Sequence, residues 1–145
     1  MTNNKHLVGA LELCDLPFLS LNGLEARVDT GATTSSLHVD NILEFEKMGE
    51  AWIKFDIHPD IHDVSQVVQR EAKVKSVRRV KSSNATLQKR HVIETDILIA
   101  GTQWSIELTL TDRSEMKYLM LLGREAMSGR LIVDPELEFV LGKPA

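Results

Sequence analysis

The stretch that decides the fold is RVDTGATTSSLHV, residues 27–39. The apolar Val28 leads directly into Asp29, and Gly31 and a run of hydroxyl side chains follow. One interpretation is an Asx-type turn that merely links two strands. The other is a carboxylate that the turn holds in place for catalysis. Asp-Thr-Gly alone favours the plain turn, because a given tripeptide occurs by chance in roughly one or two of a hundred chains of this length.

Length and composition limit the classes of protein to consider. The chain has 145 residues, 43% of them hydrophobic, so we expect one domain, residues 1–145, with its own core. The net charge of −4 does not suggest nucleic-acid binding. Cys14 is the single cysteine, which excludes an internal disulfide and suits a reducing compartment. No apolar stretch has the length of a membrane span, so we expect a soluble, cytoplasmic protein with no membrane partner.

Short apolar runs between turn residues predict a mostly β protein, a barrel or a sandwich. Asn22-Gly23 predicts a hairpin turn between arms at 18–21 and 24–28. A short helix is expected after Asp40, ending at Gly49, because apolar residues recur there at near-helical spacing. A second short helix is expected at Arg124–Met127. Strands or extended segments are predicted at 7–13, 52–57, 64–80, 92–99, 104–111, 119–122 and 131–133, with turns at 82–84 and 100–102.

The turn at Asp29 could support acid and base chemistry if a second carboxylate lies close by. Two carboxylates about 3 Å apart share one proton, because two like charges that close cannot both ionise. The ionised carboxylate then takes a proton from water, and the protonated one donates to the substrate carbonyl. Asp29, Thr30 and Gly31 are therefore the candidate catalytic turn. Asp-Thr-Gly occurs once, so the second Asp29 must come from a second copy in a homodimer.

A second motif changes the balance towards catalysis. Leu121-Leu122-Gly123-Arg124 is an apolar strand that ends in glycine and opens a short helix. Together with Val28-Asp29-Thr30-Gly31-Ala32, it resembles the retropepsin-type aspartic proteases. The resemblance implies a single-domain retropepsin-like acid-protease β-barrel with one or two short helices. It also implies that Leu121, Leu122 and Gly123 support the Asp29 turn and that Ala32 lines the base of the cleft.

The wider sequence resembles one bacterial branch. The stretches DTGATTSSLH, VKSSNATLQKRHVI, LTLTDRSEMKYLMLLGRE and LIVDP are similar to the family named as ATP-dependent zinc proteases, which is associated with RimK-type glutamate ligases. That resemblance covers residues 8–135 and implies a functional link to a glutamate ligase. The residues themselves support neither cofactor of the family's name. His-Glu-x-x-His is absent, Pro59 separates His58 from His62, and no phosphate-binding glycine loop occurs, so we expect no metal and no cofactor.

The region between the two motifs is strongly basic. In a retropepsin a flap hairpin covers the substrate, and here it corresponds to 74–92 with its tip near 82–85. Across 70–90 the sole acid is Glu71, against the cations Arg70, Lys73, Lys75, Arg78, Arg79, Lys81, Lys89 and Arg90. One interpretation is a solvated edge hairpin. The other is an acidic substrate held by Arg78, Arg79, Lys81 and Arg124, since arginine binds carboxylates through two parallel hydrogen bonds.

Three functions follow from these observations. The leading one is an aspartic-type endopeptidase, a homodimer that hydrolyses peptides or proteins, with acidic, glutamate-rich peptides as the expected substrates. The second is a zinc-dependent peptidase, as the family name says. The third is a non-catalytic module that binds an acidic protein tail.

Overall fold

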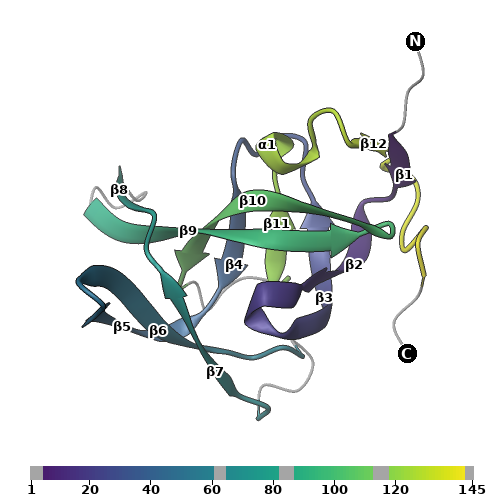
Figure 1. Cartoon of the computed structure of the whole chain (residues 1–145). Helices are drawn as coiled ribbons and strands as arrows, with labels where there is room; N and C mark the ends of the chain where they lie inside the picture. Colours follow the sequence, from purple (N-terminus) through teal and green to yellow (C-terminus); the bar gives the residue numbers. More distant parts are fainter. Residues whose placement is uncertain (1–4, 61–64, 82–86, 113–117, 143–145) are drawn as a thin grey trace.

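Six strands close into a barrel around the hydrophobic core. The computed structural model describes residues 5–60, 65–81, 87–112 and 118–142, without the side chains of residues 80 and 81. Each barrel strand pairs with the next, and the last pairs with the first (Figure 1). Around the barrel they run β10 (Thr102–Thr111), β4 (Ser35–His38), β11 (Met120–Leu122), β3 (Leu21–Val28), β2 (Leu11–Leu16) and β9 (Leu87–Ile99). This confirms the predicted retropepsin-like, mostly β architecture.

The other elements attach to the outside and the ends of this barrel. A seventh strand of the same sheet, β8 (Ser76–Lys81), pairs with β9 outside the barrel. A separate three-stranded sheet holds β5 (Asp40–Lys47), β6 (Glu50–Ile57) and β7 (Val68–Lys73). Two short strands, β1 (His6–Val8) and β12 (Leu131–Val133), pair in parallel. The helices within the described residues are η1 (Pro17–Leu19) and α1 (Arg124–Met127). Neither described helix is long and apolar enough to cross a bilayer.

Several predicted elements are confirmed. The strand predicted at 52–57 lies within β6, and those at 92–99 and 104–111 lie within β9 and β10. Ala100 and Gly101 both have positive φ, as a tight hairpin turn requires. The helix at Arg124–Met127 and the strand at 131–133 have the predicted bounds. The extended segment predicted at 64–80 divides into β7 and β8, and the turn predicted at 82–84 lies outside the described residues.

The helix predicted after Asp40 is wrong, because this segment is strand β5. It pairs antiparallel with β6, and Met48 and Gly49, both at positive φ, make the turn between them. Its side chains alternate between two faces, so Ile42 packs against the core while Leu43 is exposed. The apolar spacing fitted a helix locally, and the long partner strand decided the structure instead.

The hairpin predicted around Asn22-Gly23 is also wrong. The chain reverses at residues 17–20, and both Asn22 and Gly23 lie inside β3. There they form a bulge opposite Asp15, because Cys14 pairs with Leu24 while Leu16 pairs with Leu21. Gly23 has a φ of 66°, and its N–H donates to Asp15 Oδ1 at 2.7 Å. The Asn-Gly signal marked a real positive-φ site, in a bulge and not at a turn.

The strand predicted at 7–13 breaks into β1 and β2 at Gly9, where the C-terminal segment crosses. A Cβ on Gly9 would lie 2.3 Å from the Leu137 carbonyl oxygen, so a side chain does not fit. The Ala10 N–H donates to that carbonyl at 2.7 Å, and the Ala10 carbonyl accepts from the Val28 N–H at 2.9 Å. The C-terminal segment is thereby connected to the strand that carries Asp29.

The fully buried carboxylate of Glu12 stabilises the contact between the Gly9 region and the C-terminal segment. Its Oε2 accepts from the Gly9 and Val140 N–H groups at 2.7 and 3.0 Å, and its Oε1 accepts from Leu141 at 3.2 Å. Three backbone donors from two segments that are far apart in the sequence thus depend on one side chain.

We expect Glu12→Gln to destabilise the protein by about 2 kcal/mol, because glutamine has one acceptor oxygen and leaves a backbone donor facing its NH₂ group. Urea unfolding should show a lower midpoint with an unchanged slope. Glu138→Gln is the matched control, because Glu138 is an exposed carboxylate on the same segment. Equal stability of the two variants would contradict the assigned role of Glu12.

Candidate active site

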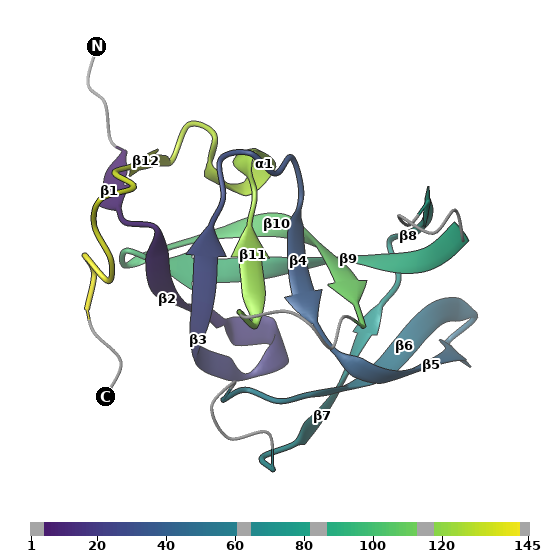
Figure 2. The same cartoon turned by 180° about the vertical axis from the view of Figure 1, so that it is seen from behind.

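Strand β11 lies between β3 and β4 and joins the two motifs of the sequence (Figure 2). It runs parallel to β3, pairing Leu122 with Val28, and antiparallel to β4, pairing Leu121 with Ser36. The Asp29 N–H continues the ladder by donating to the Leu122 carbonyl at 2.9 Å. Asp29 is therefore held at the end of a strand in the middle of a sheet.

The turn orients the Asp29 carboxylate from its own backbone. The Gly31 N–H donates to Asp29 Oδ1 at 2.9 Å, and the Ala32 N–H donates to the Asp29 carbonyl at 3.2 Å. The Asp29 side chain is half-buried, while Thr30 and Gly31 are exposed. One carboxylate oxygen is thus fixed by an amide on an accessible face. This geometry suits a carboxylate that must keep its orientation while it reacts.

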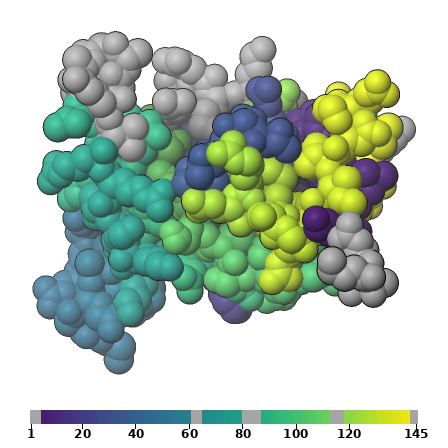
Figure 3. Space-filling view, turned by 90° about the horizontal axis from the view of Figure 1, so that it is seen from above, coloured from purple at the N-terminus to yellow at the C-terminus, as the bar shows by residue number. Residues whose placement is uncertain are grey.

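The start of α1 holds the second half of the turn. The Arg124 N–H donates to the Ala32 carbonyl at 2.8 Å, and the Glu125 N–H donates to the Thr33 carbonyl at 3.0 Å. Gly123 donates to Ser35 Oγ at 3.0 Å. The two segments lie side by side on the surface, blue and yellow-green in Figure 3. Leu122 and Gly123 therefore hydrogen-bond the turn and its flank directly.

Arg124 points its guanidinium back at the same turn. Its Nη1 donates to the Thr30 carbonyl at 2.9 Å, and its Nη2 donates to Thr33 Oγ1 at 3.0 Å. The sequence suggested substrate binding for this side chain, yet two of its donors are used within the protein. The arrangement makes Arg124 a positioning residue for the Asp29 turn.

We expect Arg124→Met to lower the free energy of unfolding by about 1 kcal/mol, since both hydrogen bonds are exposed to water. The peptidase activity that the sequence predicts for the Asp29 turn should fall more than stability does, because the turn loses two of its supports. Arg124→Lys should recover little of the loss, because an ammonium group does not reproduce the planar pair of donors. Urea unfolding and kcat/KM together test this. Full recovery in Arg124→Lys would show that the charge alone matters.

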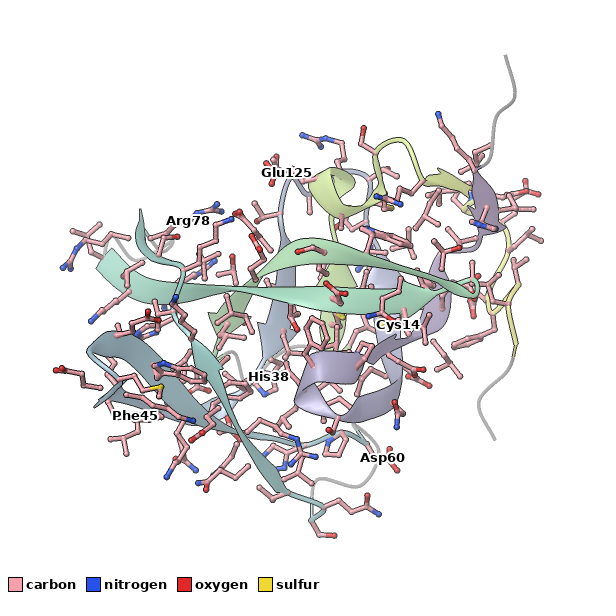
Figure 4. The ribbon with its side chains drawn as sticks, viewed as in Figure 1. Cys14, His38, Phe45, Asp60, Arg78 and Glu125 are labelled. Atoms are coloured by element: carbon pink, nitrogen blue, oxygen red, sulfur yellow. The ribbon has the colours of Figure 1, made fainter. Side chains whose placement is uncertain are left out.

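The basic hairpin is largely neutralised by acids from other strands. Arg78, seen on β8 in Figure 4, pairs with Glu107 at 3.5 Å. Lys75 pairs with Glu94 at 2.7 Å and with Glu107 at 3.4 Å. The hydrogen bond with Glu94 raises the pKa of Lys75, and the same bond lowers the pKa of Glu94. Similar pairs join Lys73 with Glu50 and Lys89 with Glu44.

The other two predicted substrate contacts on β8 are Arg79 and Lys81. Arg79 is exposed, and no acidic side chain among the described residues pairs with it. Arg78 and Arg79 are neighbours in one strand, so their side chains point to opposite faces. The side chain of Lys81 and the hairpin tip at 82–85 lie outside the described residues.

Two histidines, His38 and His58, lie close to Asp40 in the structure. His58 Nε2 lies 2.6 Å from Asp40 Oδ2, and His38 Nε2 lies 4.0 Å from Asp40 Oδ1. His62 lies outside the described residues. Across 5–60, 65–81, 87–112 and 118–142, no group of three or more His, Cys, Asp or Glu side chains is arranged to hold a metal ion.

Sequence reasoning missed Arg27, two residues before Asp29 on β3. Arg27 is exposed, and its guanidinium carbon lies 6.0 Å from the centre of the Tyr118 ring. The signal was present in the sequence, because residues two apart in a strand share a face. Arg27 becomes a stronger candidate because Lys75, Arg78 and Lys89 of the hairpin pair with acids from other strands.

Comparisons with known proteins agree with this geometry. The model of the RimB-like family, described as "Retropepsin-like aspartic endopeptidase RimB", matches residues 7–144. The chain is also similar to the crystal structure of a Legionella pneumophila protein with unknown function (DUF785), with a TM-score of 0.76 over 93% of this chain and 97% of that one. The two sequences are 32% identical.

The curated relatives are longer proteins. The chain is 46% identical over 99% of its length to a Shewanella halifaxensis protein named "Probable alpha-L-glutamate ligase", and spans 31% of that protein. It is 47% identical over 95% of its length to a Parasynechococcus marenigrum protein of the same name, and spans 30% of it. The family match covers nearly the whole chain, and it agrees with the barrel and with the way β11 and α1 hold the Asp-Thr-Gly turn. The chain therefore belongs to the RimB-like family of retropepsin-like aspartic endopeptidases.

Proposed function

We propose that this chain is an aspartic-type endopeptidase whose active site is completed by a second copy of itself. The observation that carries the proposal is the Asp29 carboxylate, held by the Gly31 amide on an accessible face of a turn that β11 and α1 support. One chain supplies one such turn. A two-fold dimer brings the same surface from each subunit together and supplies the second carboxylate.

The two Asp29 carboxylates would share one proton, as adjacent carboxylates do. The ionised one takes a proton from a water molecule, and the resulting oxygen attacks the peptide carbonyl carbon. The protonated one donates its proton to the carbonyl oxygen. The tetrahedral intermediate then breaks its C–N bond. The leaving amine takes the proton that the first carboxylate accepted from water, and the second carboxylate recovers a proton from a hydroxyl of the intermediate as the product carboxyl group forms. Thr30 and Gly31 keep the carboxylates oriented, and Ala32 lines the base of the cleft.

We propose acidic, glutamate-rich peptides or proteins as the substrates. The relatives named as probable glutamate ligases support a functional link to such a ligase. Arg79 is a proposed substrate contact because it is exposed and lacks an acidic partner among the described residues; Arg78 and Lys81 are further candidates on the same strand. We place the activity in the cytoplasm, where the free, buried Cys14 suits the reducing conditions.

Sedimentation velocity at micromolar concentration, combined with cleavage of a glutamate-rich peptide, tests the proposal. We expect a dimer that cleaves the peptide and loses activity on dilution below its dissociation constant. A monomer that cleaves with unchanged specific activity would contradict the shared site. Cleavage that a chelator abolishes would instead favour the zinc-dependent peptidase, and peptide binding without cleavage would favour the non-catalytic module.

A further inference from the structure

Arg27 lies on the same face of the sheet as Asp29. Along β3, Ala26 and Val28 are buried in the core, while Arg27 points to the opposite, exposed side. Asp29 extends the strand pairing by one residue through its N–H bond to Leu122. The strand alternation therefore carries on to Asp29, and its carboxylate leaves the sheet on the side where Arg27 stands.

Arg27 occupies the middle of a row that crosses four strands. Its register partner on β2 is Leu11, and its partner on β11 is Leu121, which in turn faces Ser36 on β4. All three partners are half-buried, so the row forms an accessible floor beside the Asp29 turn. The four residues of this row are apolar or neutral except Arg27, and the half-buried Glu25 lies two residues before Arg27 on the same face of β3. A bound peptide crossing this row would meet one fixed positive charge.

The guanidinium of Arg27 is available to a ligand. Within the described residues, no carboxylate lies within the 4.0 Å of an ion pair with Arg27, and its one described interaction is with the Tyr118 ring. A cation over an aromatic ring uses the face of the guanidinium and leaves the N–H groups at its edge for other acceptors. Those groups form the planar fork that binds a carboxylate through two hydrogen bonds.

Three other arginines already have partners within the protein. Arg124 donates to Thr30 and Thr33, and Arg78 pairs with Glu107. Arg70 donates to the carbonyl groups of Leu19 and Gln69. Arg27 thus combines three properties: the Asp29 face, an exposed guanidinium and no acidic partner among the described residues.

We propose that Arg27 binds the side-chain carboxylate of a substrate residue close to the scissile bond, and so selects glutamate- or aspartate-containing peptides. The inference rests on the proposed function, because it uses the same face and the same dimer. In a two-fold dimer the second Arg27 stands on the other side of the paired carboxylates. Substrates with an acidic residue on both sides of the cleaved bond should therefore be preferred.

Binding can be measured without cleavage in the Asp29→Asn protein. The probes are fluorescein-labelled hexaglutamate and hexaglutamine, measured by fluorescence anisotropy at low salt. We expect tighter binding of hexaglutamate, and roughly a tenfold to hundredfold loss of that affinity in Asp29→Asn/Arg27→Met. Hexaglutamine binding should change little. Arg27→Lys should retain part of the affinity, because it keeps the charge and loses the fork.

Arg130→Met is the matched control for this series. Arg130 is also an exposed arginine over an aromatic ring, at 4.9 Å from the centre of Trp104, and it follows α1 outside the floor beside Asp29. Its removal changes the net charge by the same amount. We expect hexaglutamate affinity to stay within about twofold of the parent. An equal loss in Arg130→Met and Arg27→Met would overturn the proposal, because general charge would then explain binding.

The outcomes separate this inference from the proposed function. If wild-type protein cleaves peptides and Arg27→Met keeps the same preference for acidic ones, the role of Arg27 is wrong and the peptidase assignment stands. If no peptide is cleaved but hexaglutamate binding depends on Arg27, the acidic site stands and the peptidase assignment fails. Unchanged hexaglutamate binding in Arg27→Met overturns the inference in either case.

Discussion

Replacing Asp29 with asparagine is expected to reduce peptidase activity by about 10³-fold or more, while fold and dimer persist. Asparagine has nearly the same shape as aspartate. Its Oδ1 can still accept the hydrogen bond that the Gly31 N–H donates to Asp29 Oδ1, at 2.9 Å in the wild-type protein. What the substitution removes is the carboxylate that takes a proton from water. Peptide cleavage, urea unfolding and sedimentation velocity on the same samples measure the three properties separately.

The chain offers a closely matched control in Asp15→Asn. Asp15 Oδ1 also accepts from a glycine N–H, that of Gly23 at 2.7 Å. Asp15 lies on β2 opposite the β3 bulge, at the other end of β3 from the Asp29 turn. We expect this variant to keep full activity. If Asp29→Asn and Asp15→Asn were equally active, Asp29 would have no catalytic role, and the plain-turn interpretation would be correct.

A mixing experiment tests whether two copies share the site. With free subunit exchange, an equal mixture of wild-type and Asp29→Asn chains gives one quarter wild-type dimers. A dyad needs both carboxylates, so specific activity should fall to about one quarter of that of wild type. Independent sites would instead retain one half. A value near one half would contradict the shared site even if the protein is a dimer.

The sequence predicted best where local alternation and turn chemistry agree. The hairpin of β9 and β10 and its Ala100-Gly101 turn are an example, because each strand's own pattern matches its final environment. The helix predicted after Asp40 failed, because β6 and the Met48-Gly49 turn decided that segment. Local spacing is weak information when a long partner strand is available.

The outline of the candidate site could be proposed from the sequence for a different reason. Asp29 and Leu121-Leu122-Gly123 form motifs whose members are adjacent in the sequence, so their association could be recognised. The pairing of Lys75 with Glu94 and of Arg78 with Glu107 could not, since those acids come from strands outside the basic stretch. Arg27 was hidden likewise, because its importance depends on register with Leu11 and Leu121.

Replacing Gly123 with alanine is expected to destabilise the protein by about 3 kcal/mol. The added methyl group would lie 2.5 Å from the Thr34 carbonyl oxygen and 2.6 Å from its carbon, both backbone atoms that cannot rotate away. To relieve the contact, either β11 or the turn must move. Urea unfolding should show a lower midpoint, and kcat/KM should fall beyond what the loss of folded protein explains.

The reason for the extra loss of activity is that Gly123 and the Asp29 turn share their hydrogen bonds. Moving Gly123 weakens its bond to Ser35 Oγ, and moving the next residue weakens the bond from the Arg124 N–H to the Ala32 carbonyl. Each of these bonds fixes the segment that follows Asp29. The carboxylate would then lose its alignment even in molecules that remain folded.

Gly129→Ala separates this contact from the general cost of replacing a glycine. Gly129 has a φ of 81° and open space where a Cβ would lie, so alanine there costs about 1 kcal/mol of backbone strain and touches nothing. Its activity per folded molecule should be unchanged. Gly123 has a φ of −95°, so the same methyl group acts there through the contact with Thr34. If the two variants lost stability and activity equally, the close approach of β11 to the turn would have no special role in holding Asp29.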